Sequence, residues 1–98
     1  MNKFELIIEN INKCRTGIFG LEMYTLTSIL GGYFFYCDKN GLRRCDKTLN
    51  EYLKLEIRET KKSLNILKSG KATEMQKRYV TVEELEYRLK IMKGYLGL

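Results

Sequence analysis

Apolar residues recur at helical spacing in the C-terminal half of the chain. Between residues 48 and 69, and again between 82 and 93, they follow steps of three and four, which places them on one face of a helix. The first stripe consists of Leu53, Ile57, Thr60, Leu64 and Leu67. The second consists of Val82, Leu85, Leu89 and Met92, with Leu96 at the same spacing beyond the expected end of the helix near residue 93. A polar, basic linker over residues 70–80 joins the two segments. We therefore expect an antiparallel helical hairpin.

Both helices of this hairpin begin with the same short motif. Thr48-x-x-Glu51 and Thr81-x-x-Glu84 fit the capping box, in which the Thr hydroxyl accepts a hydrogen bond from the backbone N–H three residues on. The Glu carboxylate in turn reaches back to the N–H of the Thr. Gly70 is well placed to end the first helix, because glycine tolerates the left-handed conformation of helix ends.

The N-terminal residues 2–15 also show a helical pattern. Asn2 and Glu5 resemble a helix start, and the polar side chains lie largely opposite the apolar ones. The apolar face consists of Phe4, Ile7, Ile8, Ile11 and Cys14. This segment predicts an amphipathic helix that covers a core with one face.

Residues 18–30 have an ambiguous pattern. Steps of four, three and four separate Phe19, Met23, Leu26 and Leu30, which suits a helix. The segment is also rich in β-branched and aromatic residues, which favour a strand. We expect a strand here and keep a helix as the alternative.

Residues 33–45 resemble a β-hairpin. Gly31-Gly32 predicts a break, Tyr33–Cys37 a strand, residues 38–41 a turn and Leu42–Cys45 the returning strand. The turn is either a type I turn with a bulge or a type I′ turn centred on residues 40 and 41. Neither register places Cys37 directly opposite Cys45, so a disulfide is not expected.

The fold that these patterns predict is α+β and helix-rich. It consists of the N-terminal helix, a small antiparallel β-hairpin or three-stranded sheet within residues 20–46, and the C-terminal helical hairpin. A mostly α fold, with residues 18–30 helical, is the alternative. At 98 residues, the chain is expected to form one domain, 1–98.

Charge and hydropathy indicate which cellular compartment and which kinds of partner to expect. The chain carries 18 basic and 12 acidic residues, a net charge of +6, and the excess is spread thinly along it. Local basic clusters comprise Arg43, Arg44 and Lys47, and then Lys68, Lys71, Lys77 and Arg78. No run reaches the roughly 20 apolar residues that span a bilayer, and the N-terminus does not resemble a signal peptide. We expect a cytoplasmic protein that does not bind membranes.

The residue types available argue against catalysis. There is no histidine, which removes the commonest general base near neutral pH. Cys14, Cys37 and Cys45 lack metal-ligand spacing and are expected to be reduced thiols. No phosphate-binding glycine motif occurs. We expect no enzyme activity, no cofactor and no metal.

The candidate binding residues are aromatic and basic. The run from Tyr33 to Tyr36 beside Arg43 and Arg44 could stack on bases and contact phosphates, although strand aromatics are also typical of a buried core. The cations of the linker could contact a partner or be a solvated loop. The candidates are Tyr33, Tyr36, Arg43, Arg44, Lys47, Lys71, Lys77, Arg78 and Tyr79.

These observations favour a small non-enzymatic protein that modulates or inhibits a larger protein or nucleoprotein by occupying its surface. Its usage of Lys, Asn, Ile and Tyr is typical of an AT-rich bacterial or phage gene, so a phage-type inhibitor of host defence, like an anti-CRISPR, is one form of this hypothesis. The alternative is a nucleic-acid-binding regulator of transcription or replication that uses the basic residues of the hairpin and linker. A homodimer is a further hypothesis, because the apolar stripes exceed what one small core needs.

Overall fold

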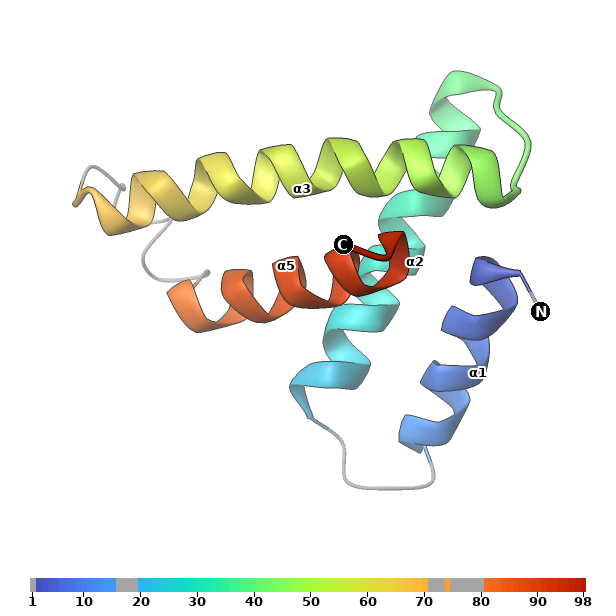
Figure 1. The fold of residues 1–98 in the computed structure, drawn as a ribbon, viewed down its shortest axis with the longest axis horizontal. Helices are drawn as coiled ribbons and strands as arrows, with labels where there is room; N and C mark the ends of the chain where they lie inside the picture. The colour runs from blue at the N-terminus through green and yellow to red at the C-terminus, as the bar shows by residue number, and fades with distance from the viewer. Residues whose placement is uncertain (1, 16–19, 71–73, 75–80) are drawn as a thin grey trace. The chain divides into compact units, whose positions relative to one another are not determined.

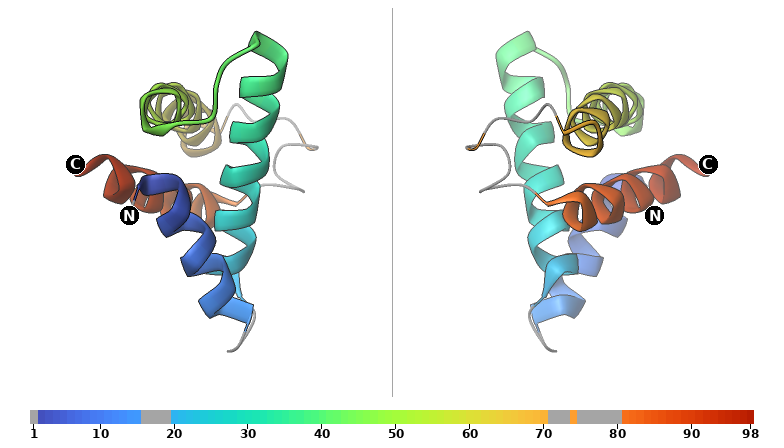
Figure 2. Two further views of the ribbon diagram at one scale, coloured as in Figure 1. Left: turned by 90° about the vertical axis from the view of Figure 1, so that its right-hand side faces the viewer. Right: turned by 90° about the vertical axis from the view of Figure 1, so that its left-hand side faces the viewer.

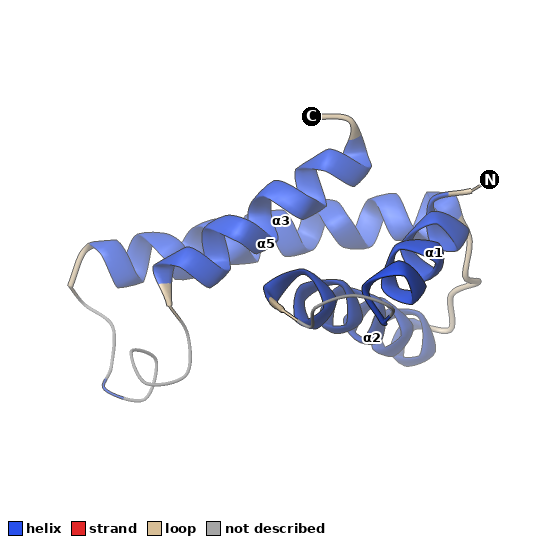
Figure 3. Ribbon diagram, turned by 90° about the horizontal axis from the view of Figure 1, so that it is seen from below, coloured by secondary structure: helices blue, strands red, loops and turns tan. Residues whose placement is uncertain are grey.

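The structure, a computed structural model, describes residues 2–15, 20–70, 74 and 81–98. The elements of these ranges are helices joined by loops, without a strand among them (Figure 3). They are α1 (Lys3–Arg15), α2 (Leu21–Asn40), α3 (Asp46–Lys68) and α5 (Val82–Leu96). Contacts gather in two compact units, Met1–Tyr52 and Leu53–Leu98. The first seven residues of α3 therefore belong to the first unit and the remainder to the second.

The predicted β-sheet over residues 20–46 is wrong. Helix α2 contains most of the expected strand 18–30 and all of the expected strand 33–37, while residues 42–45 form the loop before α3. The physical reason is burial of one helical face: Leu26, Ile29, Tyr33 and Cys37 follow steps of three, four and four and have almost no exposed surface. Burial of this face outweighs the strand preference of the β-branched and aromatic residues. The described part of the chain matches the mostly α alternative.

Helix α2 continues through both glycines that were expected to break it. Gly31 and Gly32 lie in its interior, and it ends instead at Gly41. Gly41 adopts φ +62°, and its N–H donates to the carbonyl oxygen of Cys37. This is the left-handed C-cap that glycine adopts most readily. The predicted β-turn at residues 38–41 is therefore the last turn of a helix and its cap.

The first unit is built on the pairing of α1 with α2. Figures 1 and 2 show α1 alongside the N-terminal half of α2, running in the opposite direction. The predicted start of α1 is confirmed, because Asn2 Oδ1 accepts a hydrogen bond from the Glu5 N–H at 2.8 Å. Ile7 and Ile11 of α1 are buried. The first turn of α1 also meets α3, where the Lys3 N–H donates to Asp46 Oδ1 at 3.0 Å.

Helix α3 begins earlier than its capping motif predicted. Thr48 lies within the first turn rather than at the cap, and the Leu49 N–H donates to the Cys45 carbonyl oxygen at 3.0 Å. Cys45 is therefore the N-cap residue. Its N–H donates to Thr48 Oγ1 at 3.2 Å, so Thr48 takes the place that Glu occupies in a capping box. The prediction of Thr48 as the cap residue is wrong by three positions.

The second unit contains the rest of α3 and helix α5, and both predicted helices are confirmed. Figure 1 shows α5 running antiparallel to α3. Ion pairs join Lys68 to Glu86 at 3.1 Å and Arg88 to Glu56 at 3.5 Å. The buried residues are Leu53, Ile57, Thr60, Leu64 and Met92, all of which belong to the two apolar stripes. Helix α5 extends to Leu96, three residues beyond its predicted end, and Gly97 caps it at φ +76°.

The N-cap of α5 leads to a stability prediction. The Thr81 hydroxyl accepts from the Glu84 N–H at 3.1 Å, and removal of such a cap costs about 1 kcal/mol. We expect Thr81→Ala to lower the free energy of unfolding by that amount in urea denaturation. Thr27→Ala is a matched control, because Thr27 is exposed inside α2 and Ala has the higher helix propensity. Equal losses in the two variants would contradict the assignment of Thr81 as a cap.

Candidate functional site

The junction between α2 and α3 contains a hydrogen-bonded cluster of side chains. We call residues 37–48 the corner. The Tyr33 hydroxyl reaches it from α2, lies 2.9 Å from Thr48 Oγ1 and donates to the Cys45 carbonyl oxygen at 3.1 Å. The Cys45 N–H donates to the Tyr33 hydroxyl at 2.9 Å, and the Thr48 hydroxyl donates to the Arg43 carbonyl oxygen at 2.6 Å. These bonds hold the loop of the corner against α2.

Burial raises the pKa of Tyr33 above its usual value of 10.0, and the neighbouring Cys37 thiol acts in the same direction. A tyrosine is neutral at physiological pH even at its usual pKa, so this hydroxyl keeps its proton and can donate it to the Cys45 carbonyl oxygen. Among the described residues that are not exposed, every buried side-chain nitrogen or oxygen has a hydrogen-bond partner. The cluster is thus a satisfied structural network rather than a site with an unpaired group aimed at a ligand.

Two thiols contact this network. Cys37 is fully buried and its sulfur lies 4.0 Å from Thr48 Oγ1, while the partly exposed Cys45 sulfur lies 3.7 Å from the same oxygen. The backbone N–H of Thr48, directed at the sulfur, lowers the pKa of the Cys45 thiol, and the Thr48 hydroxyl acts in the same sense. Both cysteines are free thiols, whereas the side chain of Cys14 lies outside the described part of the chain.

The outer surface of the corner combines basic and aromatic side chains. The Arg44 guanidinium lies 4.0 Å from the centroid of the Phe34 ring and 3.4 Å from Asp38 Oδ1. Lys39 Nζ lies 6.0 Å from the centroid of Phe35. Arg43 and Lys47 are exposed at the same corner. Four cations thus share this part of the chain with two carboxylates, those of Asp38 and Asp46.

The aromatic residues with the largest exposed fractions in the described part of the chain lie on α2. Tyr24 is 67% exposed and Phe35 is 69% exposed. With Ser28 and Gly31 between them, they follow steps of four, three and four, and therefore share one side of the helix. A Cβ atom added at Gly31 would meet nothing within 4 Å. We call Tyr24, Ser28, Gly31 and Phe35 the aromatic face.

The structure separates the binding residues that the sequence suggested. Tyr33 has no exposed surface, and Tyr36 is half-buried with its ring centroid 5.6 Å from that of Tyr52. The exposed candidates are brought together at the corner: Arg43, Arg44 and Lys47. The remaining candidates lie outside the described residues: Lys71, Lys77, Arg78 and Tyr79. Phe35 and Tyr24 were not among the predicted site residues. Both were expected in strands, whereas their exposure follows from the helix that they form.

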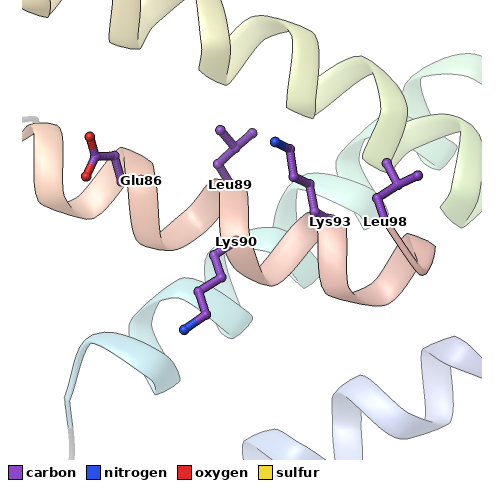
Figure 4. Close-up of a pocket in the computed structure, with 5 residues that line it drawn as sticks. All are labelled: Glu86, Leu89, Lys90, Lys93 and Leu98. Atoms are coloured by element: carbon purple, nitrogen blue, oxygen red, sulfur yellow. The ribbon is translucent and has the colours of Figure 1, made fainter.

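A surface hollow also lies along α5, lined by Glu86, Leu89, Lys90, Lys93 and Leu98 (Figure 4). Glu86, Leu89 and Lys93 project from one side of the helix, and Lys90 points the opposite way. Lys68 already pairs with the carboxylate of Glu86. Because its polar groups do not converge on one point, the hollow lacks the arrangement typical of a ligand site.

Within the described ranges, Cys, Asp and Glu side chains nowhere gather in a group of three that could hold a metal ion. No helix there combines the length and apolar character that crossing a membrane requires. Comparison of the chain with family models, curated proteins and solved structures finds no match.

Proposed function

We propose that this chain is a non-enzymatic binding protein that modulates or inhibits a larger protein or nucleoprotein by occupying its surface. The observation that supports this best is the aromatic face of α2. Tyr24 and Phe35 expose two-thirds of their surface on one side of a helix. Aromatic side chains are enriched among the residues that contribute most to protein interfaces. A helix with aromatic residues three turns apart can insert both into a groove of a partner.

The surroundings of Phe35 indicate the chemistry of that partner. Lys39 lies against the Phe35 ring, and exposed Arg43 and Lys47 follow at the corner. A partner surface with an apolar groove and carboxylates at its rim would match this arrangement. An inhibitor of a host defence complex, as a phage would carry, is one protein of this kind.

A protein partner explains the corner better than nucleic acid does. Asp38 lies 3.4 Å from Arg44, and Asp46 lies in the first turn of α3. These carboxylates would repel phosphates beside the cations that should bind them. A mixed set of charges is typical of the rim of a protein interface. The absence of histidine from the chain further favours binding over catalysis.

Photo-crosslinking in the cells that carry the gene tests this proposal. A benzophenone amino acid replaces Phe35 in one experiment and Tyr24 in another. We expect both positions to give the same adduct with a larger protein. The matched control is Lys62, whose side chain is 72% exposed on α3 and which should give no such adduct. An adduct of two copies, an adduct with nucleic acid, or equal adducts from all three positions would each contradict the proposal.

The affinity for the crosslinked partner gives a quantitative prediction. Interface anchors contribute 2 kcal/mol or more, so each of Phe35→Ala and Tyr24→Ala should weaken binding by about 30-fold or more. Both residues are exposed, so the variants should unfold at the same urea concentration as the original chain. Ile66→Ala removes an exposed apolar side chain of α3 and should leave the dissociation constant unchanged. Equal affinities in calorimetric titration of all these variants would contradict a role for the aromatic face.

A further inference from the structure

The corner places two thiols in contact with one hydroxyl group. Cys37 and Cys45 are eight positions apart, on α2 and before α3, yet their sulfurs lie 4.0 and 3.7 Å from Thr48 Oγ1. The same hydroxyl group also lies 2.9 Å from the Tyr33 hydroxyl. Both sulfurs therefore lie within contact distance of one atom, although no bond joins them in this structure. The arrangement differs from the predicted β-hairpin, in which neither register favoured a disulfide.

The two thiols have unequal surroundings. Cys37 has no exposed surface, so solutes do not readily reach its sulfur. Cys45 is partly exposed and is the N-cap residue of α3, a helix of 23 residues. The backbone N–H groups of Thr48 and Lys47 are directed at its sulfur, and Arg43 is nearby. Positive helix ends and neighbouring cations favour the thiolate, which is the reactive form of cysteine.

We propose that Cys45 is a site of oxidation by hydrogen peroxide and that Cys37 resolves the product as an internal disulfide. In the first step the Cys45 thiolate attacks one oxygen of the peroxide. The O–O bond breaks, Cys45 becomes a sulfenic acid, and the leaving hydroxide takes up a proton to form water. In the second step the sulfur of Cys37 attacks the sulfur of Cys45 and the S–O bond breaks. The hydroxyl group leaves with the proton of Cys37 as a second water molecule.

The bond would change the corner. A disulfide requires a sulfur–sulfur distance of about 2.05 Å, so Cys45 is drawn from the surface towards the buried Cys37. Cys45 and Thr48 share the first turn of α3, and their backbone and side chains share hydrogen bonds with Tyr33. Oxidation therefore acts on the network that holds the carbonyl group of Arg43. This inference concerns the thiols alone and does not depend on the proposed function.

Peptide mass spectrometry can test the assignment, because trypsin separates the three cysteines. Cleavage after Lys and Arg leaves Cys14 in peptide 14–15, Cys37 in peptide 16–39 and Cys45 in peptide 45–47. The folded protein is treated with one equivalent of hydrogen peroxide, and the free thiols are then alkylated. We expect peptide 16–39 linked to peptide 45–47, in monomeric protein, with the loss of two hydrogen atoms and reversal by dithiothreitol.

Three variants assign the roles. Cys14→Ser should form the same linked peptide as the original chain. Cys37→Ala should lose it completely and instead accumulate a Cys45 sulfenic acid that dimedone traps. Cys45→Ser should lose both the linked peptide and the dimedone adduct. A link to Cys14, links only between copies, or a Cys45 that is oxidised no faster than Cys37 in the folded protein would each overturn the proposal.

Discussion

Replacing Tyr33 by Ala should lower the free energy of unfolding by about 3–5 kcal/mol, the usual cost of truncating a large buried aromatic residue. The Tyr33 ring has no exposed surface. Its centroid lies 5.8 Å from that of Tyr52, 6.1 Å from that of Phe34 and 6.4 Å from that of Phe4. The substitution leaves a cavity at the centre of this aromatic cluster. Urea denaturation followed by circular dichroism measures the loss.

Tyr33→Phe separates the ring from its hydroxyl group. This variant keeps the aromatic packing but removes the acceptor of the Cys45 N–H and the partner of Thr48. It should cost about 1–3 kcal/mol, because polar groups of the corner lose a bond. A loss below 1 kcal/mol in Tyr33→Ala would contradict the burial of this residue. Equal losses in the two variants would contradict the contribution of the ring.

The free energy of unfolding should depend on pH differently in the original chain and in Tyr33→Phe. Burial raises the pKa of Tyr33, and the groups that face its hydroxyl are Thr48, the backbone of Cys45 and the thiol of Cys37. A raised pKa means that the unfolded chain loses this proton first as the pH rises. The stabilisation is therefore complete below the unfolded pKa near 10 and is lost as the pH rises through the folded pKa. Tyr33→Phe should show a smaller loss of stability at alkaline pH than the original chain.

The parts of the fold that could be predicted from sequence are those with local signals. The start of α1 at Asn2 and of α5 at Thr81 depends on bonds within one helical turn, and both are present. The stripe from Leu53 to Leu64 is buried as its spacing predicts. Thr48 shows the limit of such signals. A Thr in the first turn can accept from the N–H of the cap residue, so Thr-x-x-Glu does not decide which residue is the cap.

Helix α2 could not be predicted with the same ease, because its composition and its burial pattern disagree. Its buried stripe of Leu26, Ile29, Tyr33 and Cys37 is hidden in the sequence by apolar neighbours on other sides, such as Tyr24 and Phe35. Strand preference is a measure of how residues fit a half-buried sheet rather than a property of the backbone alone. Packing of α1 against α2, which involves residues far apart in sequence, favours the helix.

The wrong strand prediction for residues 33–37 also explains which candidate site residues the sequence missed. In a strand Tyr33 and Phe35 share one face, whereas in a helix they lie about 200° apart. The strand interpretation therefore treated the aromatic run as one platform. The helix buries Tyr33 and exposes Phe35. The basic residues Arg43, Arg44 and Lys47 could be found from composition alone, since charged residues remain at the surface in either fold.

Gly31→Ala and Gly32→Ala should change stability in opposite directions. Both glycines lie inside α2, where Ala is favoured over Gly by roughly 0.5–1 kcal/mol. A Cβ atom at Gly31 meets nothing within 4 Å, so Gly31→Ala should raise the free energy of unfolding by up to that amount. A Cβ atom at Gly32 would overlap the Tyr52 hydroxyl group. The gain in helix propensity is common to both variants. The difference between their free energies of unfolding therefore measures the cost of this overlap.

The overlap is costly because Tyr52 has little freedom to move away. Tyr52 is only 4% exposed, and the centroid of its ring lies 5.8 Å from that of Tyr33 and 5.6 Å from that of Tyr36. Overpacking of such a site costs about 1–3 kcal/mol, so Gly32→Ala should be less stable than Gly31→Ala by that difference in urea denaturation. Equal stabilisation by both substitutions would show that Tyr52 does not contact Gly32. Destabilisation by both would contradict a continuous helix through these residues and favour the break that the paired glycines suggest.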